Sequence, residues 1–173
     1  MSTNQSITEE MLYQYLAQYQ ISYLRFEHIP VYTCEQASLE LPHAPGAKIK
    51  NLLLSSPETG RLYLLVAAQD KRIHFKKLAK LLGEKNLRFA SPESLLGLLG
   101  VEKGAVTLLG IINDSEEKVT LLMDSDLEKA VALQCHPLVN SATLVIPGQE
   151  IIRFLTLLNH PPMYISDFAY PAG

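Results

Sequence analysis

A lysine and an asparagine stand at the entrance of one of the most apolar stretches of the chain. Lys48, Lys50 and Asn51 run directly into Leu52-Leu53-Leu54. Burying an ammonium group or a carboxamide in an apolar strand costs free energy unless the group faces a cleft or finds polar partners. The pattern therefore predicts either an exposed strand end or a cleft in which Lys50 and Asn51 meet a ligand.

Two further segments combine polar residues with apolar neighbours. Gly104-Ala105-Val106-Thr107 precedes an apolar run, and glycine beside a predicted strand indicates either a close approach to the backbone or a simple turn. The residues from His136 to Thr143, with Asn140 among them, form a polar loop between two apolar strands. Such loops often carry binding residues, although proline and asparagine also make ordinary turns.

Several other chemistries lack the residues they need. No glycine-rich phosphate loop follows a predicted strand, and the five histidines show neither HxxH nor HExxH spacing. The chain therefore predicts no metal and no cofactor. Cys135 and His136 are neighbours, so on an extended segment they point to opposite faces and do not predict a thiol nucleophile. The two cysteines lack CxxC spacing, which favours reduced thiols in the cytoplasm.

The size and composition are those of one soluble globular domain, residues 1–173. Apolar residues make up 47% of the chain and charged residues 19%. No stretch approaches the roughly 18 apolar residues that a membrane span requires, and the polar, acidic start does not resemble a signal peptide. We therefore expect a cytoplasmic protein with no membrane partner.

The net charge of −3 hides an uneven distribution. Basic side chains dominate residues 70–88, and acidic ones dominate residues 114–128. A basic face can attract a polyanion in spite of the net charge, and the alternative is a solvated amphipathic helix. The basic residues of interest are Lys71, Arg72, Lys76, Lys77 and Lys80.

Apolar periodicity, capping residues and turn residues predict a mixed α+β domain, because the strands and short helices alternate irregularly. Helices are predicted at residues 6–20, 33–39, 75–82, 91–99 and 148–158, the first from a capping box at Ser6. Strands are predicted at residues 21–26, 49–54, 61–68, 106–112, 119–123, 131–133, 142–146 and 163–165.

Six short stretches, in order between residues 27 and 146, resemble the YbaK and prolyl-tRNA synthetase editing-domain superfamily, and within it the free-standing alanyl-tRNA(Pro) deacylases. They are Glu27-His28-x-Pro30-Val31-Tyr32-Thr33, Gly46-Ala47-x-x-Lys50-Asn51-Leu52, Asp70-Lys71-Arg72 with Lys76-Lys77-Leu78, Gly104-x-Val106-Thr107, Ile112-Asn113-Asp114 and His136-Pro137-x-x-Asn140-x-Ala142-Thr143. Each stretch alone is weak, and the ordered set is specific.

The resemblance implies a curved, barrel-like mixed sheet of about seven strands surrounded by helices. It also implies that Lys50 is the central functional residue, that Asn51 supports the substrate and that His136 lines the amino-acid pocket. Substrate contacts are further implied for Gly104, Thr107 and Asn140. The basic segment itself predicts tRNA contacts for the five basic residues named above. Many members have proline where this chain has Leu108.

The implied activity is hydrolysis of mischarged tRNA(Pro), with alanine as the amino acid removed and the ribose 2′-hydroxyl assisting. The partners would be the acceptor end of tRNA(Pro) and prolyl-tRNA synthetase. Three alternatives stay open: a deacylase for cysteinyl-tRNA(Pro) or another small residue, a non-catalytic module that binds tRNA or the synthetase, and a small-molecule-binding regulatory domain.

Overall fold

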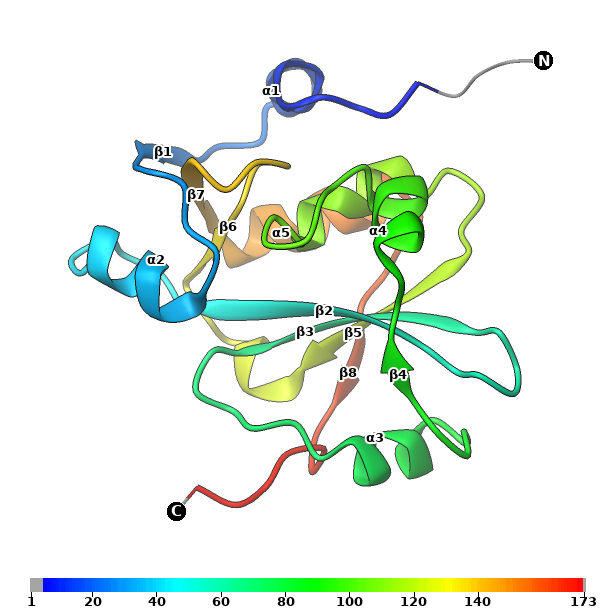
Figure 1. Cartoon of the computed structure of the whole chain (residues 1–173). Coiled ribbons are helices and arrows are strands. Elements are labelled where there is room, and N and C mark those ends of the chain that lie inside the picture. Colours follow the sequence, from blue (N-terminus) through cyan, green and yellow to red (C-terminus); the bar gives the residue numbers. More distant parts are fainter. Residues whose placement is uncertain (1–4, 173) are drawn as a thin grey trace.

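The structure is a computed structural model that describes residues 5–172, apart from the side chain of Cys34. Helices and strands alternate along the chain (Figure 1). Their order is α1 (Glu9–Gln18), β1 (Leu24–Glu27), α2 (Cys34–Glu40), β2 (Ile49–Ser55), β3 (Leu62–Ala68), α3 (Phe75–Leu81), β4 (Arg88–Phe89), α4 (Pro92–Leu99), the 3-10 helix η1 (Leu108–Asn113), β5 (Val119–Asp124), the 3-10 helix η2 (Ser125–Leu127), β6 (Ala132–Cys135), β7 (Ala142–Pro147), α5 (Gly148–Leu157) and β8 (Met163–Ile165).

The strands form two sheets, which corrects the expected single barrel-like sheet of about seven strands. One sheet has the order β4-β2-β3-β5-β8, and the other has the order β1-β7-β6. The two sheets meet at a single parallel bridge between Ala47 and Leu133. The mixed α+β class is confirmed, but one bridge does not continue the hydrogen-bond ladder around a barrel.

Gly46 allows the close approach at that bridge. Its φ is +92°, and a Cβ atom there would lie 3.2 Å from the carbonyl oxygen of Ala132. A side chain at this position would be strained by both the backbone conformation and the contact. The chain can therefore pass against β6 immediately before it enters β2.

In the larger sheet, β2 and β3 form an antiparallel hairpin that is paired along its whole length, from Ile49 opposite Ala68 to Ser55 opposite Leu62. β3, β5 and β8 run parallel to one another. The carboxyl ends of these three strands therefore meet at one edge of the sheet, which is the same end as the start of β2.

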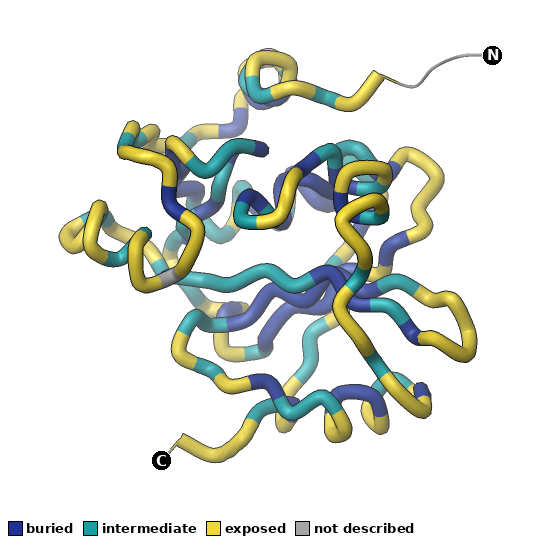
Figure 2. The backbone as a smooth tube through the Cα atoms, viewed as in Figure 1, coloured by how far each residue is buried: buried dark blue, intermediate teal, exposed yellow. Residues whose placement is uncertain are grey.

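β3 is buried on both faces, which explains its unbroken apolar sequence. Leu64 and Val66 belong to the large core cluster together with residues of α1, α4, α5 and the smaller sheet. Leu65 and Ala67 belong to a second cluster beneath α3 and the C-terminal segment. The buried residues follow these strands through the centre of the molecule (Figure 2).

The apolar run at residues 106–112 was predicted to be a strand, and this prediction is wrong. Residues from Leu108 onward form η1, and the hydroxyl of Thr107 caps it by accepting a hydrogen bond from the backbone N–H of Leu109 at 3.2 Å. A short buried apolar run does not distinguish helix from strand by periodicity. The capping threonine was the local signal for a helix.

The other predicted elements occur with small shifts of their ends. The first helix is capped by Thr8, not by Ser6, and the strand predicted at residues 21–26 is found at β1. Thr33 and Ser91 cap α2 and α4 as predicted. The structure adds the two-residue strand β4 to the predicted set. No helix within residues 5–172 is long and apolar enough to cross a membrane.

Candidate functional site

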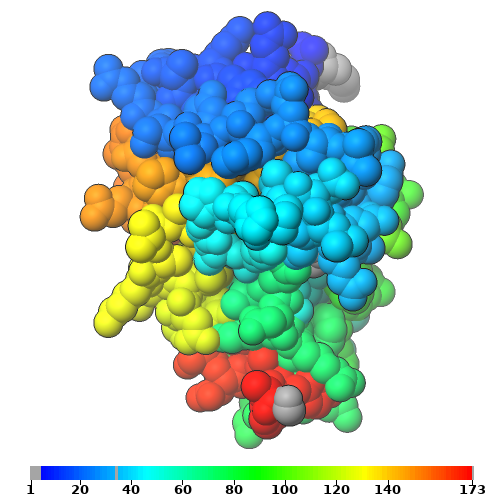
Figure 3. Space-filling view, turned by 90° about the vertical axis from the view of Figure 1, so that its left-hand side faces the viewer, coloured from blue at the N-terminus to red at the C-terminus, as the bar shows by residue number. Residues whose placement is uncertain are grey.

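A cleft lies between the two sheets, beside the first half of β2. On the outer edge of β2, β4 pairs only with Leu54 and Ser55, so the ladder with β4 stops before the polar start of the strand. The cleft has a volume of about 320 Å³ and is walled by β2, by the end of β6 and by the segment that leads into α2. α2 and the residues that lead to β2, coloured cyan, form the centre of this face (Figure 3).

The cleft brings together four of the six substrate residues expected from the sequence. Lys50 and Asn51 reach it from β2, Gly104 from the loop before η1, and His136 from the end of β6. These residues are spread over more than half of the chain and meet only because the two sheets face one another. Thr107 and Asn140 are not among the lining residues.

Lys50 lies on β2 opposite Ala67, with its side chain half-buried. Its ammonium group donates a hydrogen bond to the backbone carbonyl of Lys71, in the turn that follows β3. The contact fixes one direction of an otherwise flexible side chain. An ammonium group carries three donors, so it can hold this carbonyl and a ligand at the same time.

Asn51 lines the cleft and carries a side-chain oxygen that lacks a hydrogen-bond donor among the described residues. Its Oδ1 atom is buried, and among the described residues it has no hydrogen-bond partner. A buried acceptor without a donor costs about 1–3 kcal/mol. A hydrogen-bond donor from a ligand or a water molecule would remove this cost.

His136 has one assigned and one available ring nitrogen. Nδ1 lies 3.1 Å from the carbonyl oxygen of Ala142 and must donate to it, because a carbonyl oxygen only accepts. Burial lowers the pKa of His136 below its usual value, and the nearby His28 ring adds to this, while the bond to Ala142 opposes it. The ring is therefore neutral at neutral pH, with Nε2 left as an acceptor.

His28 supports this arrangement and was not singled out from the sequence. Its ring lies edge-on to that of His136, with 6.3 Å between the centroids. Its Nε2 lies 2.9 Å from the hydroxyl of Thr143, which also lines the cleft. Both residues belong to the stretches that carried the family resemblance, and that was the signal for them.

Asn140 and Thr107 do not line the cleft and instead make hydrogen bonds within the fold. The side chain of Asn140 donates to the carbonyl of Val31 at 2.9 Å, and the backbone N–H of Val31 donates back to the carbonyl of Asn140 at 3.1 Å. This pair of hydrogen bonds ties the His136 loop to the segment before α2. Thr107 is fully buried and caps η1.

Leu108, which stands where many family members have proline, is also fully buried. It is the first residue of η1, a position at which proline is well tolerated, and it does not line the cleft. The departure from the family pattern therefore lies in the packing behind the site.

Gly104 is favoured by its backbone conformation, and it lies against an aromatic residue to which the sequence assigned no role. Its φ is +96°, and a Cβ atom there would lie 3.2 Å from Cδ1 of Tyr32. The backbone N–H of Tyr32 is held by the side chain of Gln36 at 2.7 Å, while its side chain is 67% exposed. The close approach expected at Gly104 is thus an approach by the ring at the cleft rim.

The five basic residues separate into different environments. The ammonium of Lys71 pairs with Asp124 and Asp126, and Arg72 lies over the ring of Tyr170 at 4.7 Å from its centroid. Lys76, Lys77 and Lys80 are exposed on α3 and do not line the cleft. Two residues of the acidic segment, Asp124 and Asp126, thus pair with Lys71 at the start of the basic segment.

Cys135 also lines the cleft, but burial raises the pKa of its thiol well above the usual range. The thiol therefore stays protonated and is a poor nucleophile. Within residues 5–172, no group of three or more histidine, cysteine or acidic side chains gathers in a way that could hold a metal ion.

Comparisons with known proteins identify the family of the chain. The model of the aminoacyl-tRNA editing domain family matches residues 28–154, which include every cleft residue named above. The prolyl-tRNA synthetase associated domain-containing protein 1 of Danio rerio is 33% identical over 157 residues, covering 90% of this chain and 85% of its own. The prolyl-tRNA editing protein ProX of Acetoanaerobium sticklandii is 34% identical over 140 residues, covering 81% and 85%.

A solved structure of a candidate trans-editing enzyme for prolyl tRNA synthetase shares the fold. Its TM-score is 0.67 at 19% identity, and the match covers 96% of this chain and 99% of that one. At this identity the likeness concerns the fold alone. The family match and the two relatives carry the assignment, and the chain belongs to the aminoacyl-tRNA editing domain family.

Proposed function

We propose that this protein hydrolyses the ester bond of mischarged tRNA(Pro), with alanyl-tRNA(Pro) as its preferred substrate. The observation that carries the proposal is the meeting of Lys50, Asn51 and His136 in one cleft of limited volume. Relatives named for prolyl-tRNA editing support the choice of tRNA. The acceptor end of tRNA(Pro) would enter the cleft beside β2.

The cleft suits an ester that is already activated. Hydrolysis adds water to the carbonyl carbon and places negative charge on the carbonyl oxygen, which a fixed cation can stabilise. Lys50 offers such a cation, already held by the Lys71 carbonyl. The water, positioned with the help of the ribose 2′-hydroxyl, would form the new bond to the carbonyl carbon, and the bond from that carbon to the ribose 3′-oxygen would break. The leaving oxygen would take up the proton that the water loses, so that the free amino acid and uncharged tRNA form without a protein nucleophile.

Selection by size would come from the His136 side of the cleft. A neutral ring held by Ala142 is a rigid wall, and the Asn140–Val31 bonds hold its loop in place. Attraction alone separates substrates that differ by one methylene by only about 1–3 kcal/mol. Steric exclusion of the proline ring by a rigid wall is not bound by that limit.

A deacylation panel tests the proposal. Alanyl-, cysteinyl-, seryl- and prolyl-tRNA(Pro) are offered to the purified chain, and kcat/KM is measured for each. We expect alanyl-tRNA(Pro) to be the best substrate and prolyl-tRNA(Pro) to be spared. Preference for cysteinyl-tRNA(Pro) would show that the protein is a deacylase with another substrate, and the assignment to alanine would be wrong.

Binding of tRNA(Pro) without hydrolysis of any ester would show that the protein is a non-catalytic binding module.

We also propose that the protein works in the cytoplasm beside prolyl-tRNA synthetase, because that enzyme produces the mischarged tRNA. Addition of the synthetase to the panel tests this partnership: a direct partner would raise the rate of deacylation, and an independent editor would act at an unchanged rate.

A further inference from the structure

Lys71, which the sequence assigned to tRNA binding, is enclosed by groups of the fold. Its ammonium lies 2.6 Å from Asp124 and 2.7 Å from Asp126, and 5.1 Å above the ring of the buried Phe168. Burial opposes its charge, but the bonds to the two carboxylates outweigh this and raise the pKa of Lys71. The side chain, which is 24% exposed, is thus held in its charged form by groups of the fold.

Asp124 is the centre of this arrangement. It is the last residue of β5 and is fully buried. One of its oxygens accepts from the backbone N–H of Ala68 at 3.0 Å. The other binds the ammonium of Lys71 and also accepts from the backbone N–H of Asp126 at 3.0 Å. Because β3 and β5 are parallel, their carboxyl ends lie together, and Asp124 holds the turn that leaves β3.

That turn ends at the backbone carbonyl which receives the ammonium of Lys50. The turn is held on its other side as well, because the N–H of Gln69 donates to the carbonyl of Lys48 at 3.1 Å. The C-terminal segment closes it from outside through a bridge between Ile73 and Ala169. The red C-terminal residues and the green residues that follow β3 lie together at the lower end of Figure 3.

We propose that Asp124 is a positioning residue for Lys50, acting through the Lys71 turn. Asp124 fixes the two ends of residues 68–71, and the carbonyl of Lys71 in turn fixes the direction of the Lys50 ammonium in the cleft. The inference rests on the proposed function, because it assumes that Lys50 stabilises the reacting ester. It assigns Lys71 to the positioning of Lys50 and removes it from the residues that contact tRNA.

The geometry explains why such a device is useful. A lysine side chain has several rotatable bonds, and its ammonium stabilises a developing charge only when it is already in place. A small displacement of a catalytic group, even one caused by a distant change, can lower the rate by about a hundredfold. A carbonyl on a turn held by a buried carboxylate supplies this fixed position.

The test is the isosteric substitution Asp124→Asn. A carboxamide has one acceptor oxygen, so it cannot serve both Ala68 and the Lys71 ammonium as the carboxylate does. We expect kcat on alanyl-tRNA(Pro) to fall by about tenfold or more, with KM nearly unchanged. The double variant Lys71→Met/Asp124→Asn removes both charges together and avoids an unpaired buried charge; the same fall in kcat is expected.

The rival assignment predicts the opposite sign. If Lys71 binds the tRNA backbone, Asp124→Asn leaves its ammonium paired with Asp126 alone and more available to a phosphate, so KM falls and kcat stays, and the proposal is overturned. Glu84→Gln is the matched control, because Glu84 is also a buried carboxylate against the β2–β3 hairpin but lies far along it from the cleft. A general loss of stability would affect both variants, whereas the positioning effect belongs to Asp124 alone.

A second measurement separates the proposal from the proposed function. In protein labelled with 13C-lysine, the Cε resonance of Lys50, assigned by its absence in Lys50→Arg, reports the environment of the ammonium. We expect it to shift or broaden in Asp124→Asn and in the double variant, and to stay in place in Glu84→Gln. An unmoved resonance in folded Asp124→Asn overturns the positioning role. A shifted resonance in a protein that hydrolyses no aminoacyl-tRNA would instead locate the failure in the proposed function.

Discussion

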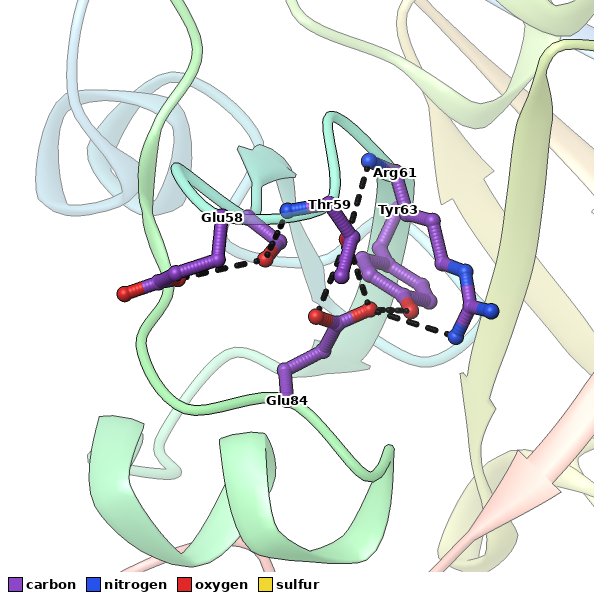
Figure 4. A network of polar contacts seen from close by, with 6 residues as sticks. Glu58, Thr59, Arg61, Tyr63 and Glu84 are labelled. Atoms are coloured by element: carbon purple, nitrogen blue, oxygen red, sulfur yellow. Dashed lines mark hydrogen bonds and ion pairs between the residues drawn. The ribbon is translucent and has the colours of Figure 1, made fainter.

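Polar side chains lie against both ends of the β2–β3 hairpin. At the turn end they are fully hydrogen-bonded, whereas at the cleft end a buried acceptor has no partner among the described residues. At the turn end, Glu84 is completely covered and accepts from the hydroxyl of Tyr63 at 2.6 Å and from that of Thr59 at 3.0 and 3.1 Å (Figure 4). At the cleft end, the buried Oδ1 of Asn51 has no partner among the described residues. A polar cluster that satisfies itself stabilises the fold, whereas a buried acceptor without a donor costs free energy.

The charges differ in the same way. Glu84 has an additional ion pair with Arg61 at 3.6 Å, and its hydrogen bonds, that from Tyr63 first, lower the pKa of its carboxyl group. Lys50 is held by a neutral carbonyl, so its positive charge is directed by the fold but not neutralised by that contact. The role of a charged group at this hairpin thus depends more on its partners than on its position.

The largest expected effect is that of Lys50→Ala on catalysis. Loss of a fixed group that stabilises a developing negative charge typically costs about a hundredfold or more in kcat, and we expect such a loss on alanyl-tRNA(Pro). The free energy of unfolding should stay within about 1 kcal/mol of the unmodified protein, since the side chain is only half-buried. Single-turnover deacylation and urea unfolding measure the two quantities.

The control for Lys50→Ala is Lys129→Ala, which removes an exposed lysine of the same charge. Its activity should equal that of the unmodified protein. Turnover by Lys50→Ala within a few-fold of the control would show that the cleft end of the hairpin is not the catalytic end.

An intermediate effect is expected from the basic face of α3. Replacing Lys76, Lys77 and Lys80 with glutamine should raise KM and lower the salt dependence of tRNA binding, by about one unit of slope for each phosphate that is no longer neutralised. Their side chains are exposed and lie outside the cleft, so kcat should change little. Binding measured at several salt concentrations tests this, with Lys118→Gln/Lys129→Gln, which removes two exposed positive charges outside α3, as the control for a general loss of positive charge. An unchanged slope would make this face a solvated helix surface.

A smaller and more selective effect is expected at His136. His136→Ala should raise kcat/KM for prolyl-tRNA(Pro) relative to alanyl-tRNA(Pro) by about tenfold, because removal of the ring widens the cleft. His136→Gln keeps much of the volume and should change the ratio less. The ratio of the two kcat/KM values is the measurement, since it reports discrimination in the transition state. Equal ratios in all three proteins would place the size limit on another wall.

Most of the secondary structure could be predicted from local signals. Thr33 and Ser91 indicate their helices as caps, and the apolar residues on both sides of the 56–60 turn indicate the hairpin. The separation into two sheets could not be predicted, because it depends on which strands pair across the molecule. The role of Thr107 was missed for a related reason: a buried threonine before an apolar run suits a strand edge as well as a helix cap.

The sequence singled out the lysine, asparagine and histidine that line the cleft, but it did not indicate their hydrogen-bond partners. Lys50 and Asn51 are conspicuous because they interrupt an apolar strand. The ion pair between Lys71 and Asp124 and the hydrogen bond from Tyr63 to Glu84 join residues far apart in the sequence, so no local pattern indicates them. A count of basic residues in a segment cannot distinguish a lysine that faces solvent from one that anchors a turn.

The last prediction concerns Glu84→Gln, which should leave kcat/KM on alanyl-tRNA(Pro) unchanged and lower stability at neutral pH. The folded state lowers the pKa of Glu84 from its ordinary value of 4.5, so its contribution is present above about pH 4.5 and is lost as the pH falls toward the folded-state pKa. The difference in unfolding free energy between the two proteins should therefore shrink between pH 7 and pH 3. Urea unfolding across this range measures it, with the exposed Glu116→Gln as the control. A gap that stays constant with pH would mean that the carboxylate charge contributes nothing at the turn end. A loss of activity in the folded variant would mean that the two ends of the hairpin are coupled.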